Sequence, residues 1–124
     1  MAERDRGRAP RVERRLFVHY RPTQTASPAW GYSQIKDFSL EGLAFMGDQP
    51  FEEGTELEMR LASPLLPFRP VVLHGRVQWS RPVVEGIRYD NGVAFTRVDE
   101  ASRVVIERSF EIFHARQVRR DKRA

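Results

Sequence analysis

The 124-residue chain contains no cysteine. This absence excludes disulfides, thiolate zinc sites, iron–sulfur clusters and cysteine nucleophiles, and it fits a reducing compartment. The uncharged, largely apolar run at residues 61–68 is interrupted by two prolines and is far too short to span a membrane. No apolar segment or small-residue cleavage site follows the basic residues 4–15, so no signal peptide is predicted. We therefore expect a soluble, cytoplasmic protein that folds as a single domain.

Residues suited to catalysis or metal binding are also few. His19, His74 and His114 are far apart in the sequence and lack the spacing of metal ligands or of a catalytic triad. The glycine-rich loops that bind nucleoside triphosphates and dinucleotides are absent from the sequence. We therefore expect no enzymatic activity, no metal and no cofactor.

Lysine is scarce, because 19 of the 21 basic residues are arginine. Residues 1–21 carry seven arginines and three acids, residues 114–124 carry five basic residues and one acid, and residues 22–113 carry nine basic and thirteen acidic residues. Arginine suits bidentate recognition of phosphate and stacking on bases, although a coding bias toward arginine explains the excess equally well. We expect a flexible arginine-rich arm over 1–10, a folded domain over 11–118 and a basic tail over 119–124.

Six segments have the β-branched, aromatic or alternating pattern of strands. They are residues 16–20, 31–38, 43–46, 55–61, 71–80 and 87–95. We expect Arg81-Pro82 to end the fifth strand and a bulge at Asn91-Gly92 in the sixth. The connections are too short for helical crossovers, so the sheet should be antiparallel. The predicted fold is all-β, a six-stranded antiparallel barrel whose closure removes exposed strand edges.

The C-terminal segment changes to a helical period. Asp99 is a good N-cap residue, and Ile106, Phe110 and Phe113 recur at the spacing of one helix face. We predict an α-helix over about 99–117 that packs on the barrel as a lid. A partner-binding helix is the alternative interpretation of the same apolar face.

One constellation of residues points to a ligand. Asp37, Ser39 and Gly42 form the pattern D-x-S-x-x-G between two predicted strands. The carboxylate can accept two donors from the edge of a guanine, with the serine hydroxyl beside it. Glycine suits a backbone position with positive φ or a close approach of a ligand. Upstream, Arg11 and Arg15 form R-x-x-x-R, which can pair with phosphate and stack on a purine.

These two motifs, in this order, resemble the signature of the PilZ domain, the bacterial receptor module for cyclic di-GMP. The resemblance covers residues 11 to about 117. It extends to a strand after the signature, a Gly-Thr turn, a Val-x-Trp strand and a Gly-Val-x-Phe strand. These features stand here as Leu43-Ala44-Phe45, Gly54-Thr55-Glu56-Leu57, Gly75-Arg76-Val77-Gln78-Trp79 and Gly92-Val93-Ala94-Phe95. The fold that the resemblance implies, a six-stranded barrel with a C-terminal helix, agrees with the strand count above.

The resemblance also implies a function and a set of site residues. The chain would be a non-catalytic receptor that binds cyclic di-GMP and alters a downstream partner protein. The arginine pair, Arg11 and Arg15, would contact the phosphates and guanines, and Asp37, Ser39 and Gly42 would line the guanine site. Further contacts are expected from Arg8, Arg14 and Trp79, although the indole of Trp79 equally suits packing in the barrel.

Two other functions remain open from the sequence. A small β-barrel with basic ends could bind RNA or DNA through arginines and exposed aromatic residues. The acidic excess of residues 22–113 argues against this function, because it offers a polyanion no broad basic face. A structural PilZ-like subunit that binds no ligand is the third possibility, and the complete D-x-S-x-x-G pattern disfavours it.

Overall fold

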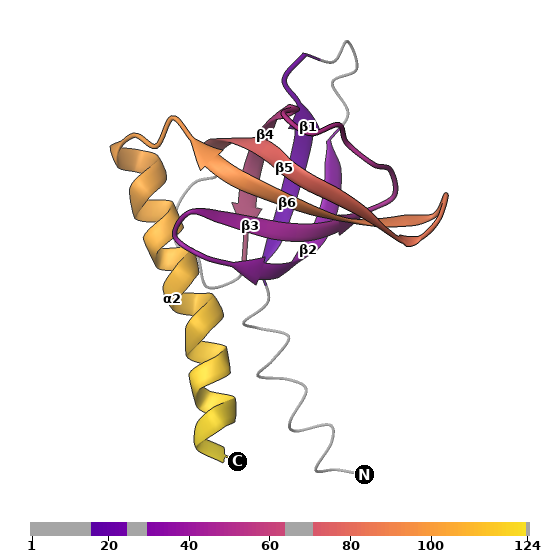
Figure 1. The fold of residues 1–124 in the computed structure, drawn as a ribbon. Helices are drawn as coiled ribbons and strands as arrows, with labels where there is room; N and C mark the ends of the chain where they lie inside the picture. Colours follow the sequence, from indigo (N-terminus) through magenta and orange to yellow (C-terminus); the bar gives the residue numbers. More distant parts are fainter. Residues whose placement is uncertain (1–15, 25–29, 64–70, 124) are drawn as a thin grey trace.

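The computed structural model describes residues 16–24, 30–63 and 71–123, with side chains up to residue 115. Within these ranges the chain forms six strands and the helix α2 (Figure 1). Their bounds are β1 Phe17–Pro22, β2 Gly31–Phe38, β3 Gly42–Gly47, β4 Glu56–Ala62, β5 Val72–Val84, β6 Arg88–Thr96 and α2 Glu100–Arg123. The strands pair antiparallel in a closed barrel of order β1-β2-β3-β6-β5-β4. The predicted all-β barrel with a C-terminal helix is confirmed, whereas the predicted arm over 1–10 lies outside the described residues.

Alternation along the strands builds the barrel core. In β4, Leu57, Met59 and Leu61 are buried, and the intervening residues face outward or are half-buried. Buried residues of β1, β2, β3, β5 and β6 join them, among them Val18, Ile35, Phe45, Val77 and Val93. The period-2 pattern of residues 55–61 therefore predicts the inner face of β4 correctly.

Helix α2 closes one side of the barrel (Figure 1). Its first turn is capped by Asp99, whose Oδ1 accepts a hydrogen bond of 2.8 Å from the backbone N–H of Ser102. Ile106 and Phe113 are buried in the core and Phe110 is half-buried against it, so the predicted stripe does pack on the barrel. None of the described helices is both long and apolar enough to cross a membrane.

The helix is longer than predicted, because it ends at Arg123 rather than near residue 117. The apolar period stops at Phe113, and for this reason the sequence predicts that the helix ends within about one turn of that residue. Glutamine, arginine and lysine, which follow it, are good helix formers and continue the backbone without an apolar face. Part of the segment predicted as a basic tail is therefore helical.

Strand β5 also differs from its prediction. It continues through Arg81-Pro82 to Val84, so the proline does not end the strand. The pairing register with β6 shifts between Pro82 and Val84. A strand tolerates proline, which has no backbone N–H, at such an irregularity in the hydrogen-bond ladder. The predicted bulge at Asn91-Gly92 has its extra residue on the opposite strand, because Gln78 lies between the pairs Val77↔Val93 and Trp79↔Gly92.

Candidate functional site

The D-x-S-x-x-G residues lie at the turn between β2 and β3. The pairing of these strands shifts between Ile35↔Phe45 and Asp37↔Ala44, so Lys36 is an extra residue. This bulge breaks the alternation of β2, and both Lys36 and Asp37 face solvent while Phe38 is buried. Asp37 and Ser39 therefore lie exposed on either side of a residue that belongs to the core.

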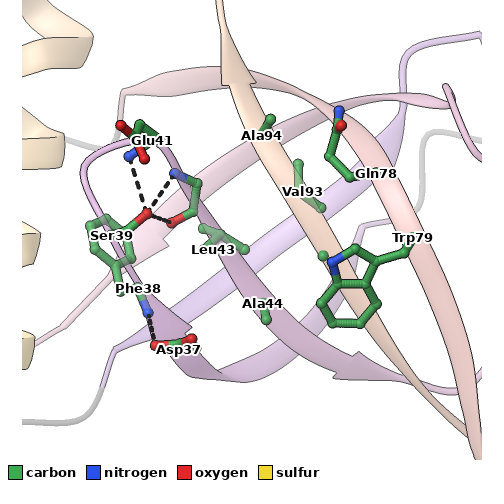
Figure 2. A pocket seen from close by; sticks show the side chains of 12 residues that line it. Asp37, Phe38, Ser39, Glu41, Leu43, Ala44, Gln78, Trp79, Val93 and Ala94 are labelled. Atoms are coloured by element: carbon green, nitrogen blue, oxygen red, sulfur yellow. Dashed lines mark hydrogen bonds between the residues drawn. The ribbon is translucent and has the colours of Figure 1, made fainter.

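Ser39 holds the turn together. Its Oγ accepts hydrogen bonds from the backbone N–H groups of Glu41 and Gly42, each at 3.2 Å, and donates to the Gly42 carbonyl oxygen at 3.3 Å (Figure 2). A hydroxyl offers one donor and two acceptor sites, so the turn uses the whole capacity of this side chain. Asp37 is less engaged, because among the described residues its carboxylate accepts one hydrogen bond, at Oδ1 from the Phe38 N–H at 3.0 Å.

Gly42 is required by the barrel itself. A Cβ atom at this position would lie 2.2 Å from the carbonyl oxygen of Val93 on β6. Its φ lies outside the left-handed region that is recorded for Gly54 and Gly86. Glycine is needed here for neither of the two reasons expected from the sequence, positive φ or the close approach of a ligand, but because the backbone of a neighbouring strand lies close.

The turn forms one wall of a surface pocket of about 260 Å³, here called the Asp37 pocket. It is lined by Asp37, Phe38, Ser39, Glu41, Gly42, Leu43, Ala44, Gln78, Trp79, Gly92, Val93 and Ala94 (Figure 2). The fold thus brings all three predicted motif residues and Trp79 together. The described lining contains two carboxylates and no basic side chain.

Trp79 forms the far wall of the Asp37 pocket, with its indole flat against β6. A Cβ atom on Gly92 would lie 2.2 to 2.5 Å from the indole ring atoms, so only glycine allows this approach. The guanidinium of Arg81 lies over the ring, 4.4 Å from its centroid. Such a cation–π contact is favourable by about 0.5–1 kcal/mol at an exposed site. The indole is therefore both packed on the barrel and covered by a cation.

The predicted arginines Arg8, Arg11, Arg14 and Arg15 lie outside the described residues. The first described residue is Leu16, whose carbonyl oxygen accepts a hydrogen bond of 2.9 Å from the Ile35 N–H. Ile35 is two residues before Asp37 on β2. The chain therefore enters β1 at the end of the barrel that carries the D-x-S-x-x-G turn.

Sequence reasoning missed two features of the surface. Gln78 lines the Asp37 pocket and is the extra residue of the bulge in β5. The sequence predicted a bulge at Asn91-Gly92, but no local signal places its extra residue on the opposite strand. Trp30, which had no expected role, lies beneath the guanidinium groups of Arg21 and Arg60, at 4.4 and 4.6 Å from its ring centroid.

Trp30 lines a second hollow, of about 850 Å³, with Tyr20 and the residues that follow β3. Burial and the nearby carboxylate of Asp48 raise the pKa of Tyr20 above its usual value. The phenol therefore stays neutral across the physiological range. Within the part of the chain that the structure describes, no three His, Asp or Glu side chains are placed to hold a metal ion.

Comparison with known families identifies the fold. The sequence pattern of the PilZ domain family matches residues 5–111. The chain belongs to the PilZ domain family. A solved structure with the same fold is the PilZ domain with c-di-GMP of YcgR from Escherichia coli. It aligns with a TM-score of 0.56 and 18% sequence identity, over 87% of this chain and 86% of that one. Comparison with curated proteins gives no match.

Proposed function

We propose that this PilZ protein is a non-catalytic, bacterial and cytoplasmic receptor that binds cyclic di-GMP at the Asp37 pocket and relays the signal to a partner protein. The observation that carries the proposal is the pocket itself. The exposed carboxylate of Asp37, the turn organised by Ser39 and the edge of Trp79 meet there, at the end of the barrel where the arginine-rich segment joins β1. The PilZ domain of YcgR, with the same fold, is known with c-di-GMP.

The charge of the pocket supports a role for the arginine motif in our proposal. The ligand carries two phosphates, and the described lining offers it two carboxylates and no cation. Arg15 precedes Leu16, and successive Cα atoms are about 3.8 Å apart, so the chain length allows Arg15 and Arg11 to reach this end of the barrel. In our proposal these two arginines bind the phosphates and cover the guanines, and Arg8 and Arg14 give further contacts.

Base recognition falls to Asp37. Its Oδ2 has no partner among the described residues, and Oδ1 accepts only one backbone N–H. A carboxylate with this free capacity can accept the N1–H and N2–H donors of guanine. Ser39 acts by holding the backbone of the turn, since its own hydrogen-bonding capacity is already used there. Adenine lacks both donors and would leave the carboxylate unpaired.

In our proposal a guanine of the ligand replaces Arg81 on the indole of Trp79. A guanine that stacks on the indole takes the place of the Arg81 guanidinium. The released guanidinium is then available to pair with a phosphate of the ligand. This exchange keeps the indole covered by a planar group before and after binding.

Isothermal titration calorimetry of the purified protein tests the function. We expect binding of cyclic di-GMP, with cyclic di-AMP weaker by roughly 30- to 150-fold, because an unpaired acceptor at the site costs about 2–3 kcal/mol. Asp37→Ala and Arg15→Ala should each weaken binding strongly and leave the fold intact. Asp48→Ala, an exposed acid that lines the second hollow, is the matched control. Equal affinity for the two dinucleotides, or affinity that grows with oligonucleotide length, would contradict the proposal and favour a nucleic-acid-binding barrel.

A further inference from the structure

The D-x-S-x-x-G turn contacts helix α2 through Phe38. Asp37 and Ser39 face outward, whereas the Phe38 side chain between them is 2% exposed. The Phe38 ring packs on Phe113 of the helix, with ring centroids 6.4 Å apart. Its carbonyl oxygen lies 3.2 Å from Nε2 of His114, the next helix residue. Figure 1 shows the β2–β3 turn beside α2.

The imidazole of His114 packs against two aromatic rings of the same helix. It contacts Phe110, with ring centroids 4.2 Å apart, and Phe113, with centroids 5.5 Å apart. A carbonyl oxygen can only accept a hydrogen bond, so His114 must donate from Nε2–H. The helix therefore contacts Phe38 in two ways: Phe113 packs on its side chain, and His114 binds its backbone carbonyl oxygen.

We infer that His114 is a positioning residue that couples the ligand-binding turn to helix α2. The Phe38 backbone cannot move when a ligand engages the neighbouring Asp37 without disturbing this hydrogen bond. Because coupling between two sites is reciprocal, a docked helix favours the binding geometry of the turn, and a bound ligand stabilises the docked helix. The ligand part of this inference rests on the proposed function, whereas the mechanical link between turn and helix does not.

Three variants separate the hydrogen bond from simple packing. His114→Phe keeps a ring against Phe110 and Phe113 and removes the N–H donor. His114→Gln keeps a donor of similar reach and removes the ring. Glu107→Gln, at an exposed position on the same helix, is the control for helix composition.

The first measurement is amide hydrogen exchange by NMR without ligand. In His114→Phe we expect the Ser39 N–H, which donates to the Gly42 carbonyl oxygen, to exchange about two- to tenfold faster than in the wild type. His114→Gln should restore most of the protection, and Glu107→Gln should leave it unchanged. Wild-type exchange at Ser39 in His114→Phe would overturn the inference.

The second measurement adds cyclic di-GMP. In the wild type the ligand should slow exchange along residues 105–114. In His114→Phe this response should be lost, with binding weaker by about two- to tenfold. Failure of the wild type to bind cyclic di-GMP would reject the proposed function, and the ligand-free comparison would still decide the role of His114.

A third measurement needs no variant and applies even if His114→Phe does not fold. The ¹⁵N chemical shifts of the wild-type imidazole at pH 8 report which ring nitrogen carries the proton. We expect the Nε2–H form, with a hydrogen bond to the Phe38 carbonyl oxygen. A ring protonated only on Nδ1 cannot donate from Nε2, and that result would overturn the inference.

Discussion

Asp37, Phe38 and Ser39 are adjacent, yet each has a different physical task. Asp37 is the exposed acceptor, Phe38 anchors the turn in the core, and Ser39 closes the turn through three hydrogen bonds. The motif could be found from the sequence because it is local. The division of tasks could not, because it depends on the bulge at Lys36 and on contacts with the distant helix.

At the residue scale, Gly92 offers a test of how the wall of the Asp37 pocket is built. In Gly92→Ala the new Cβ would lie 2.2 to 2.5 Å from the Trp79 ring, which must move. We expect a loss of about 1–3 kcal/mol in the free energy of unfolding, weaker binding of cyclic di-GMP and a shifted tryptophan emission. Urea unfolding followed by fluorescence and circular dichroism measures the first effect.

The control for Gly92→Ala is the same substitution in a Trp79→Ala background. If the clash with the indole is the cause, Gly92→Ala costs much less there, and the two sites show a clear coupling energy. A purely additive double mutant would show that another contact of Gly92 limits stability.

At the scale of elements, the sequence predicts the start and the buried face of helix α2 correctly, but not its end. Asp99 signals the start of the helix, and its capping bond is present. The apolar stripe correctly predicts which face is buried, although Phe113 is 3% exposed and Phe110 only half-buried. The end of the helix was missed because the polar residues beyond Phe113 carry no period that could mark it.

The unequal burial of the two phenylalanines gives a stability prediction. Phe113→Ala should lower the free energy of unfolding by about 3–5 kcal/mol, because a fully buried ring is removed from the core. Phe110→Ala should cost distinctly less, since part of that ring is already in contact with water. Denaturant titration of both variants measures the difference, and a larger loss for Phe110→Ala would contradict the packing described here.

The helix cap predicts a pH effect. The hydrogen bonds from Ser102 lower the pKa of Asp99 below its ordinary value of 3.8. A carboxyl group with a lowered folded-state pKa contributes stability that is complete above its unfolded value. This contribution is lost as the pH falls through the folded value. As the pH falls from 7 to 2.5, any stability advantage of the wild type over Asp99→Asn, which keeps a cap without a charge, should therefore shrink.

Asp99→Ala removes the cap altogether and should be the least stable of the three proteins at pH 7. The measurement is urea unfolding of the wild type and both variants at the two pH values. A difference between wild type and Asp99→Asn that is the same at both would show that the charge of Asp99 does not contribute.

At the scale of the whole molecule, the barrel was predicted from short connections and alternating strands. Closure was inferred from the need to protect edges, and it is made by the pairing of β1 with β4, from Phe17↔Ala62 to Pro22↔Leu57. The Asp37 pocket could be predicted only in part. Its turn is local in sequence, whereas Gln78, Trp79 and Gly92 come from strands about forty to fifty residues further along, and only the barrel register brings them to the same place.

The last prediction concerns the stability of the whole domain. A ligand that binds only the folded state stabilises it by about 2.7 kcal/mol at a free concentration one hundred times Kd. For a domain of this size that gain raises Tm by roughly 10 °C. We expect this rise with cyclic di-GMP and a much smaller one with cyclic di-AMP at the same concentration, measured by differential scanning calorimetry. Asp37→Ala should unfold near the wild-type temperature without ligand, because its side chain is exposed, and should lose most of the ligand-induced rise. An equal rise in Asp37→Ala would show that cyclic di-GMP binds elsewhere on the barrel, and the second hollow beside Trp30 would then be the place to look.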